Sequence, residues 1–152
     1  MKPNVKKLLL YLAVPLAVGG LATLISGGMS GFSDLNQPPL SPPGWVFPVV
    51  WSILYLLMGY AAYRVSEASG DSKQALLFYG LQLLVNFLWP IVFFRFDAYL
   101  AAFIVLLTLW VLVVITLWKF DKLDEIAGSL LLPYLLWITF AGYLNLGVYL
   151  LN

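Results

Sequence analysis

The chain is organised around residues 38–51, Pro38-Pro39-Leu40-Ser41-Pro42-Pro43-Gly44-Trp45-Val46-Phe47-Pro48-Val49-Val50-Trp51, where a proline-rich segment runs directly into an aromatic one. Each proline fixes its own φ and biases the preceding residue toward extended backbone, which predicts a polyproline-like strap over residues 38–43. Pro48 is compatible with a helix only near the first turn, where an N–H would lack a partner anyway. We therefore expect a helix to begin near residues 44–47, with the strap as the lid of a pocket.

The predicted helix carries an aromatic stripe directly below the strap. Phe47, Trp51, Tyr55 and Met58 follow one another at spacings of four, four and three residues. Residues at these spacings share one helix face. The strap should therefore end above an apolar, aromatic surface.

Composition places the chain in a bilayer. Of its 152 residues, 62% are hydrophobic and only 10% are charged, which is too apolar for a soluble globule of this length. The charged residues separate long apolar runs, each able to supply the roughly 20 residues of a membrane span, and the alternation typical of a transmembrane barrel is absent. We expect an all-α membrane protein, a five transmembrane helix bundle forming a single domain over 1–152, with helices near 5–26, 44–66, 74–94, 98–118 and 126–150 and a lid loop over 27–43.

The first apolar run has an alternative interpretation as a cleavable signal peptide, because Lys2, Lys6 and Lys7 precede it. The run is longer than the apolar core of such a peptide and reaches Ser26 without a polar cleavage zone. We therefore expect it to be a membrane helix.

The chain contains no cysteine and no histidine. This excludes a disulfide framework, a Cys/His metal centre and hydrolysis by a Ser-His or Cys-His pair, and we expect no metal site. A net charge of +1 gives no reason to expect a nucleic-acid partner.

The distribution of Lys and Arg predicts the orientation in the membrane, since these residues concentrate on the inner side. With the N-terminus inside, only Arg95 lies on the outer side. The strap and the C-terminus would then be outside. The seven basic residues of the inner side are Lys2, Lys6, Lys7, Arg64, Lys73, Lys119 and Lys122.

The first helix carries a row of small residues that includes Ala17 and Gly20. Small residues allow a second helix to approach closely. The neighbour could be a helix of the same subunit or of a second copy, and the sequence leaves both open.

Two further helices carry candidate pocket residues. Gln82, Asn86 and Trp89 share one face of the third helix, where amides are costly unless they meet partners or a cavity. Trp137 and Ala141 share a face of the fifth helix, and the small alanine leaves space for a flat ligand beside the indole. In both helices, plain interhelical packing is the alternative. No internal repeat and no mid-membrane charge is visible, which argues against an ion-coupled transporter.

These motifs together resemble the TspO/MBR family, the tryptophan-rich sensory proteins related to the mitochondrial translocator protein or peripheral benzodiazepine receptor. The resemblance covers nearly the whole chain and implies a five-helix bundle, a homodimer in most members, whose first loop closes over a pocket for porphyrins and synthetic benzodiazepine-site ligands. The motifs that carry it are Pro42-Pro43-Gly44, Phe47-Pro48-Val49-Val50-Trp51, Asn86-Phe87-Leu88-Trp89, Pro133-Tyr134-Leu135-Leu136-Trp137 and Leu144-Asn145.

The resemblance departs from the family pattern at two places, and a third observation concerns the cholesterol-recognition pattern of animal members, which needs a basic residue after a tyrosine near the C-terminus. Many members have a Trp-Tyr pair in the first loop where this chain has Gly31 and Phe32, and a lysine where it has Gln37. Tyr149 is followed by no basic residue, so cholesterol binding is not carried over. With the aromatic stripe added to the family matches, the expected ligand-binding residues are Phe32, Pro42, Pro43, Phe47, Trp51, Tyr55, Asn86, Trp89, Trp137, Ala141 and Leu144.

The resemblance and the residues together favour a multi-pass membrane protein that binds protoporphyrin IX as ligand or substrate and requires no resident cofactor. The resemblance also implies light- and oxygen-dependent porphyrin breakdown, for which Trp51 and Trp137 are the candidate redox indoles. Expected partners are membrane lipid and a second copy of the chain, in the cell membrane if the source is bacterial. A transporter of porphyrins or lipophiles and a tetrapyrrole- or stress-sensing regulator are the alternatives.

Overall fold

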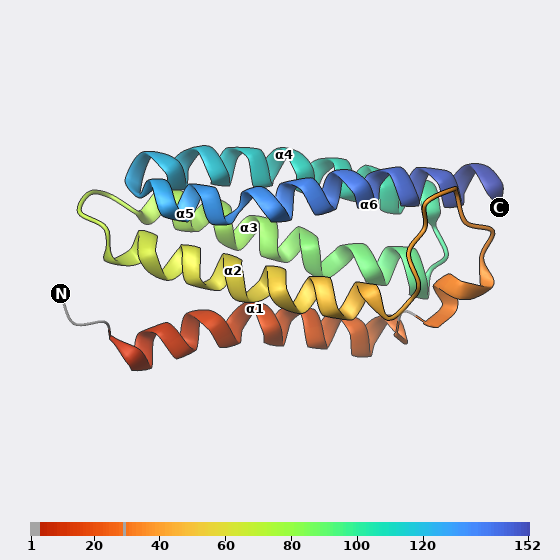
Figure 1. The fold of residues 1–152 in the computed structure, drawn as a ribbon, viewed down its shortest axis with the longest axis horizontal. Helices are drawn as coiled ribbons and strands as arrows, with labels where there is room; N and C mark the ends of the chain where they lie inside the picture. Colours follow the sequence, from red (N-terminus) through yellow and green to blue (C-terminus); the bar gives the residue numbers. More distant parts are fainter. Residues whose placement is uncertain (1–3, 29) are drawn as a thin grey trace.

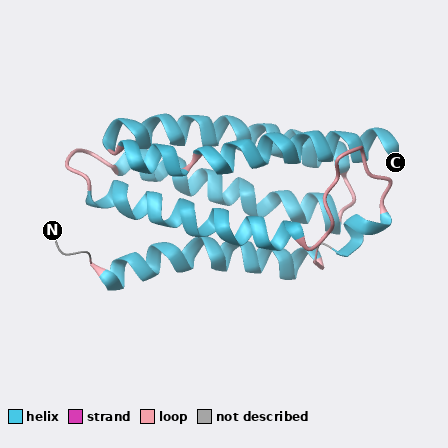
Figure 2. Ribbon diagram, viewed as in Figure 1, coloured by secondary structure: helices cyan, strands magenta, loops and turns pink. Residues whose placement is uncertain are grey.

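The computed structural model describes residues 4–28 and 30–152, and this part of the chain contains helices and no strands. Its long helices lie antiparallel, with the connecting segments at the two ends of the bundle (Figures 1 and 2). The helices form five spans long and apolar enough to cross a membrane, which confirms the predicted fold class. They are α1 (Val5–Ser26), α2 (Val46–Glu67), α3 (Lys73–Pro90), α4 (Tyr99–Leu123), α5 (Glu125–Leu130) and α6 (Leu132–Leu151), with short turns η1 (Ser30–Asp34) and η2 (Ile91–Arg95).

The fifth span is divided into α5 and α6 at Leu131. Pro133 lies in the first turn of α6 and has no N–H to donate back to the preceding turn. The helical hydrogen-bond ladder is therefore interrupted within the span that was predicted as one helix over 126–150.

The third and fourth predicted helices need correction at their ends. The third, predicted to residue 94, ends as an α-helix at Pro90 and continues as one π-helical turn, η2. The fourth, predicted to end at residue 118, continues to Leu123, so only Asp124 separates it from α5. Phe120 is fully buried against Tyr79, and this packing holds the extra helical turn in place.

The predicted polyproline-like strap is wrong at its centre, where the chain turns at Pro39 and Leu40. Leu40 has φ of 72°, a left-handed conformation that costs a side chain about 1–2 kcal/mol. The Ser41 hydroxyl donates to the Pro38 carbonyl at 2.7 Å, and the Tyr143 hydroxyl of α6 donates to the Pro39 carbonyl at 2.6 Å. Tertiary contacts therefore hold a turn that proline geometry alone does not predict.

The strap lies against the C-terminal end of α6 (Figure 1). Asn36 donates its backbone N–H to the Asn152 side chain at 3.2 Å, and its amide donates to the Leu151 carbonyl at 3.3 Å. Pro38 packs directly on Gly147, where a β-carbon would overlap the proline ring. The strap is thus fastened to the last turns of the chain.

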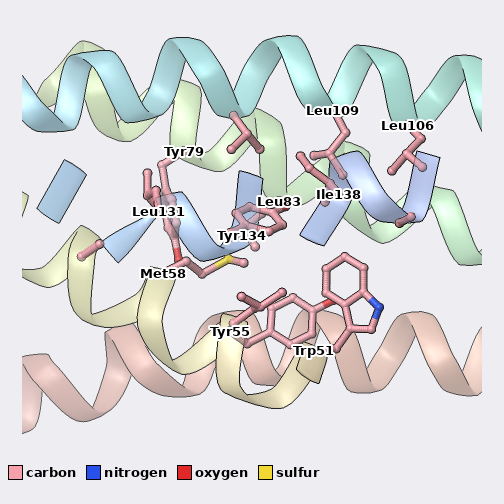
Figure 3. Packing of buried hydrophobic residues seen from close by; sticks show 14 of the residues in the cluster. Trp51, Tyr55, Met58, Tyr79, Leu83, Leu106, Leu109, Leu131, Tyr134 and Ile138 are labelled. Carbon is pink, nitrogen blue, oxygen red and sulfur yellow. The ribbon is translucent and has the colours of Figure 1, made fainter. Parts of the chain in front are cut away.

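The most buried span is α2 and the least buried is α1. Met58, Ala61 and Val65 are fully enclosed along α2, facing the helices that surround it. In the close-up of the core, Trp51 and Tyr55 lie side by side on α2 and face Tyr134 of α6 (Figure 3). α2 is therefore the central helix, and α1 covers one side of it.

Most of the basic residues gather at one end of the bundle. Lys7 pairs with Glu67, and Arg64 Nε lies 3.0 Å from a carboxylate oxygen of Asp124. The side chain of Asp124 also caps α5. These pairs join the ends of α1, α2 and α5.

Candidate ligand-binding site

A chain of buried hydrogen bonds connects three helices beneath the aromatic stripe. The Tyr55 hydroxyl donates to Asn86 Oδ1 at 2.8 Å, and Asn86 Nδ2 donates to the Tyr134 hydroxyl at 2.8 Å. Tyr134 then donates to Gln82 Oε1 at 2.7 Å. The amides of α3 therefore meet partners on α2 and α6, which removes the cost of placing them inside a membrane.

A cavity of about 450 Å³ lies above this network, between α1, α2 and α3. Its volume falls within the range of small-molecule sites. Four predicted site residues form its inner wall, Trp51, Tyr55, Asn86 and Trp89. The remaining wall comes from Leu16, Gly19, Gly20, Ala22, Thr23, Ser33, Gly44, Pro48, Ser52 and Pro90.

The α1 side of the cavity exists because its residues are small. Gly19 leaves room for the ring of Tyr55, which a β-carbon would overlap. Gly20 has open space in the direction of an added β-carbon. Within one subunit, the small residues of α1 therefore serve packing against Tyr55 and the cavity wall, while a contact of α1 with a second copy stays a prediction.

The cavity reaches the outer surface of the bundle between α1 and α2. Leu16 and Gly20 of α1 and Pro48 and Ser52 of α2 are wall residues that are also exposed. This surface belongs to membrane-spanning helices. The opening between them therefore faces lipid.

A second recess, of only about 20 Å³, lies behind Trp51 and Trp89. Ala141 and Leu144 line it, so the predicted wall of α6 is present but nearly closed. The Trp89 indole donates to Asn145 Oδ1 at 2.9 Å, which fixes it between the two spaces. The recess is otherwise filled by Phe32, Phe47, Phe93 and Phe94.

Trp137 contacts Trp51 but does not line the large cavity. Their rings are 6.4 Å apart and nearly perpendicular, at 88°. Trp137 instead lines a shallow apolar groove between α2 and α6, and its Nε1–H is buried with no acceptor among the described residues. The two tryptophans expected to bind the ligand therefore do not line one cavity. Trp51 lies in the wall of the large cavity, and Trp137 lies behind Trp51.

The two strap prolines contribute less than expected. Pro42 is half-buried and Pro43 is exposed, while the cavity wall takes Gly44 and Pro48 from the same stretch. Gln37, which replaces the family lysine, donates to the Phe32 carbonyl at 2.8 Å and ties the strap to η1.

Sequence reasoning missed the α1 wall and the hub of the polar network. Thr23 and Gly20 belong to the small-residue row of α1 and line the cavity. A row of small residues predicts room beside the helix, but it does not distinguish a closely packed neighbouring helix from an open cavity. Tyr134 lies within a quoted motif, and its fully buried hydroxyl had no sequence signal of its own. Among the described residues, no group of three or more His, Cys, Asp or Glu side chains could hold a metal ion.

Fold and site define an α-helical, multi-pass membrane protein with an aromatic-walled cavity of ligand size. The profile of the TspO/MBR family matches residues 10–151. The chain belongs to this family.

Relatives span bacteria and animals. The tryptophan-rich sensory protein of Cereibacter sphaeroides is 46% identical over 121 residues, covering 80% of this chain and 76% of that protein. Protein CrtK of Rhodobacter capsulatus is 36% identical over 145 residues, covering 93% and 90%. The translocator protein of Bos taurus is 36% identical over 122 residues, covering 78% and 72%.

Proposed function

We propose that this protein binds a flat, largely apolar tetrapyrrole, protoporphyrin IX, in the cavity between α1, α2 and α3. The observation that carries the proposal is a cavity of about 450 Å³ whose wall holds Trp51, Tyr55 and Trp89 and no charged residue. Aromatic rings bind flat apolar ligands through stacking and edge contacts. The same cavity would accept the synthetic ligands expected from the family resemblance.

Trp51 is the wall residue best supported by its surroundings. Tyr55 stacks on it at 5.6 Å between ring centroids, with 27° between the planes. Tyr134 and Trp137 present their edges to it at 6.2 and 6.4 Å. These contacts restrict the indole to one orientation, which lowers the ordering cost of ligand binding.

We also propose that the protein promotes light- and oxygen-dependent breakdown of the bound porphyrin. The porphyrin would absorb the light, and dissolved dioxygen would be the oxidant. Trp51 supplies an electron-rich ring at the cavity wall, and Trp137 is the indole in contact with it. Their roles differ because only Trp51 can touch the ligand.

The test is a titration of the purified full-length chain with protoporphyrin IX in detergent. Dark binding is followed by porphyrin absorbance, and porphyrin loss is then followed under light in air. Trp51→Phe should weaken dark binding by about 0.5–1.5 kcal/mol, or up to about tenfold in Kd, and slow the light reaction further. Trp137→Phe should leave dark binding within about twofold and slow only the light reaction.

Trp118→Phe is the matched control, because Trp118 is an exposed indole at the other end of the bundle, beside Lys122. It should change neither readout. Absence of saturable dark binding to the unmodified chain would overturn the binding proposal. Undiminished porphyrin loss in a Trp51→Phe/Trp137→Phe double variant would overturn the redox role.

A further inference from the structure

The wall of the cavity carries no charge, although the proposed ligand does. Protoporphyrin IX has two carboxylates at one edge of its ring. Inside the cavity, the Thr23 hydroxyl donates to the Gly19 carbonyl at 2.9 Å and the Ser52 hydroxyl to the Pro48 carbonyl at 2.7 Å. An unpaired buried carboxylate is strongly unfavourable, so the carboxylate edge requires a partner outside this wall.

The π-helical turn η2 places Arg95 beside the outer rim of the cavity. Pro90 belongs to the wall, and the next residues form i to i+5 hydrogen bonds, as Phe96 N–H does to the Ile91 carbonyl at 3.2 Å. Such a turn is one residue wider than an α-helical turn, and here it covers residues 91–95 directly after Pro90. Arg95 therefore lies at the end of the single turn that follows the wall residue Pro90, toward the outer end of the bundle.

A hydrogen bond to α1 confirms this position. Arg95 Nη1 donates to the Ile25 carbonyl at 3.0 Å. Ile25 follows the wall residue Thr23 by two positions on α1. Arg95 thus links η2 to α1 at the outer end of the bundle, next to wall residues of both α3 and α1 in the sequence.

The positive charge of Arg95 is not neutralised by an acidic side chain of the described residues. Its hydrogen-bond acceptor on α1 is a neutral carbonyl, its side chain is exposed, and it forms no ion pair within the part of the chain that the structure describes. Asp34 of η1 and Asp97, which follows η2, are the acidic residues of the same end of the bundle. Neither makes an ion pair with Arg95 within the described part of the chain. A guanidinium has five N–H donors in a planar fork that matches a carboxylate, so most of its donors remain for an incoming anion.

We propose that Arg95 is the specificity-determining residue for the anionic edge of the ligand. It selects planar apolar molecules with a carboxylate at the rim, while Trp51 and Trp89 contact the ring system. This inference rests on the proposed function, because it concerns the same cavity. It adds a residue that neither the aromatic stripe nor the quoted motifs include.

The experiment compares protoporphyrin IX with its dimethyl ester, which has the same ring and no carboxylate. Both are titrated in the dark into the full-length chain in detergent, into Arg95→Gln and into Arg95→Lys. Arg95→Gln should raise the Kd of the diacid about tenfold, which is the effect of losing one partly exposed charge-assisted hydrogen bond. The Kd of the ester should stay within about twofold of its value for the unmodified chain. Arg95→Lys should recover part of the diacid affinity, because it keeps the charge and loses the fork.

Lys122→Gln is the control, since it removes one positive charge at the opposite end and should change neither titration. Equal weakening of diacid and ester by Arg95→Gln would show a structural role and overturn the inference, as would unchanged diacid binding. If the unmodified chain binds neither compound, the proposed function itself fails. If it binds both and Arg95→Gln does not discriminate between them, only this inference fails.

Discussion

The Tyr134 hydroxyl ties α6 to α3 at two positions, within a chain of hydrogen bonds that joins three helices. It accepts a hydrogen bond from Asn86 and donates one to Gln82, while Tyr55 completes the chain from α2. Tyr134 and Gln82 are fully buried and are not among the cavity-wall residues, so no water replaces a partner lost from either. The network also fixes the floor of the cavity, because Tyr55 and Asn86 belong to its wall.

We predict that Tyr134→Phe lowers stability by about 1–2 kcal/mol. The substitution keeps the ring and leaves an amide N–H of Asn86 and the carbonyl of Gln82 without a partner, and single interhelical hydrogen bonds in membranes contribute about 0.6 kcal/mol on average. Thermal unfolding in detergent measures the loss. Tyr149→Phe is the control, because Tyr149 is exposed and its hydroxyl makes no hydrogen bond with the residues that the structure describes. A Tyr134→Phe melting temperature equal to that of Tyr149→Phe would contradict the prediction.

Single residues also show where the sequence stops being informative. Trp51, Tyr55, Asn86 and Trp89 could be predicted because spacing along a helix fixes which residues share a face. The place of Trp137 could not, because its own helix face does not determine how α6 is rotated against α2. The left-handed backbone of Leu40 could not be predicted either, since it depends on contacts such as the hydrogen bond from the Tyr143 hydroxyl to the Pro39 carbonyl.

Elements could be predicted where membrane thickness fixes their length. α1 occupies the predicted residues 5–26, because a long apolar run has few other solutions in a bilayer. The break in the fifth span and the π-helical turn after Pro90 were missed. Both lie beside a proline, since the break at Leu131 comes just before Pro133 and η2 comes just after Pro90. A proline permits a kink, a break or a wider turn, and the neighbouring helices decide which one forms.

The contact between α1 and α2 depends on Gly59. A β-carbon there would overlap the backbone carbonyl of Tyr11 and lie 3.1 Å from Leu12 Cα. Backbone atoms cannot move aside as a flexible side chain can, so Gly59→Ala should separate the two helices. We expect a loss of about 1–3 kcal/mol, seen as a lower melting temperature.

Gly80→Ala provides the matched control, because Gly80 is also within a spanning helix and an added β-carbon there meets no side chain and no neighbouring helix within 4 Å. It should melt at or above the temperature of the unmodified chain, since alanine favours the helix. If Gly59→Ala and Gly80→Ala melt alike, α1 can shift freely and the cavity has no fixed width.

The expected homodimer remains a prediction, and the structure suggests a cleaner test of it. Gly20 borders the cavity, so replacing it would alter the site as well as the helix surface. Ala17 is exposed on α1 and is not among the cavity-wall residues. If α1 forms the dimer contact, Ala17→Leu should shift the detergent-solubilised protein toward monomer in light-scattering chromatography. An unchanged mass with normal melting would place the contact on another helix.

At the scale of the whole molecule, charge is distributed asymmetrically along the bundle. Lys7, Arg64, Lys73 and Lys119 lie near helix ends at one end of the bundle, and Arg95 lies at the other. We propose that the richly basic end faces the cytoplasm, with the strap and the C-terminus outside.

We predict that single cysteines at Ser69 and Phe96 label from opposite sides of sealed vesicles. Both positions are exposed and lie in connections at opposite ends of the bundle, and the chain has no native cysteine to interfere. A membrane-impermeant maleimide should reach Phe96→Cys from outside right-side-out vesicles and Ser69→Cys only after lysis. Labelling of both from the same side would refute the proposed topology.

The opening between α1 and α2 determines which concentration governs occupancy. A ligand that enters through a lipid-facing gap is drawn from the bilayer, so its mole fraction among the lipids sets the fraction of protein bound. Apparent dissociation constants expressed per volume of water should then rise in proportion to the amount of lipid or detergent present, and become constant once expressed per lipid. For this protein, strongly lipophilic compounds would gain potency by accumulating in the membrane, even where their contacts with Trp51 are no better than those of a water-soluble analogue.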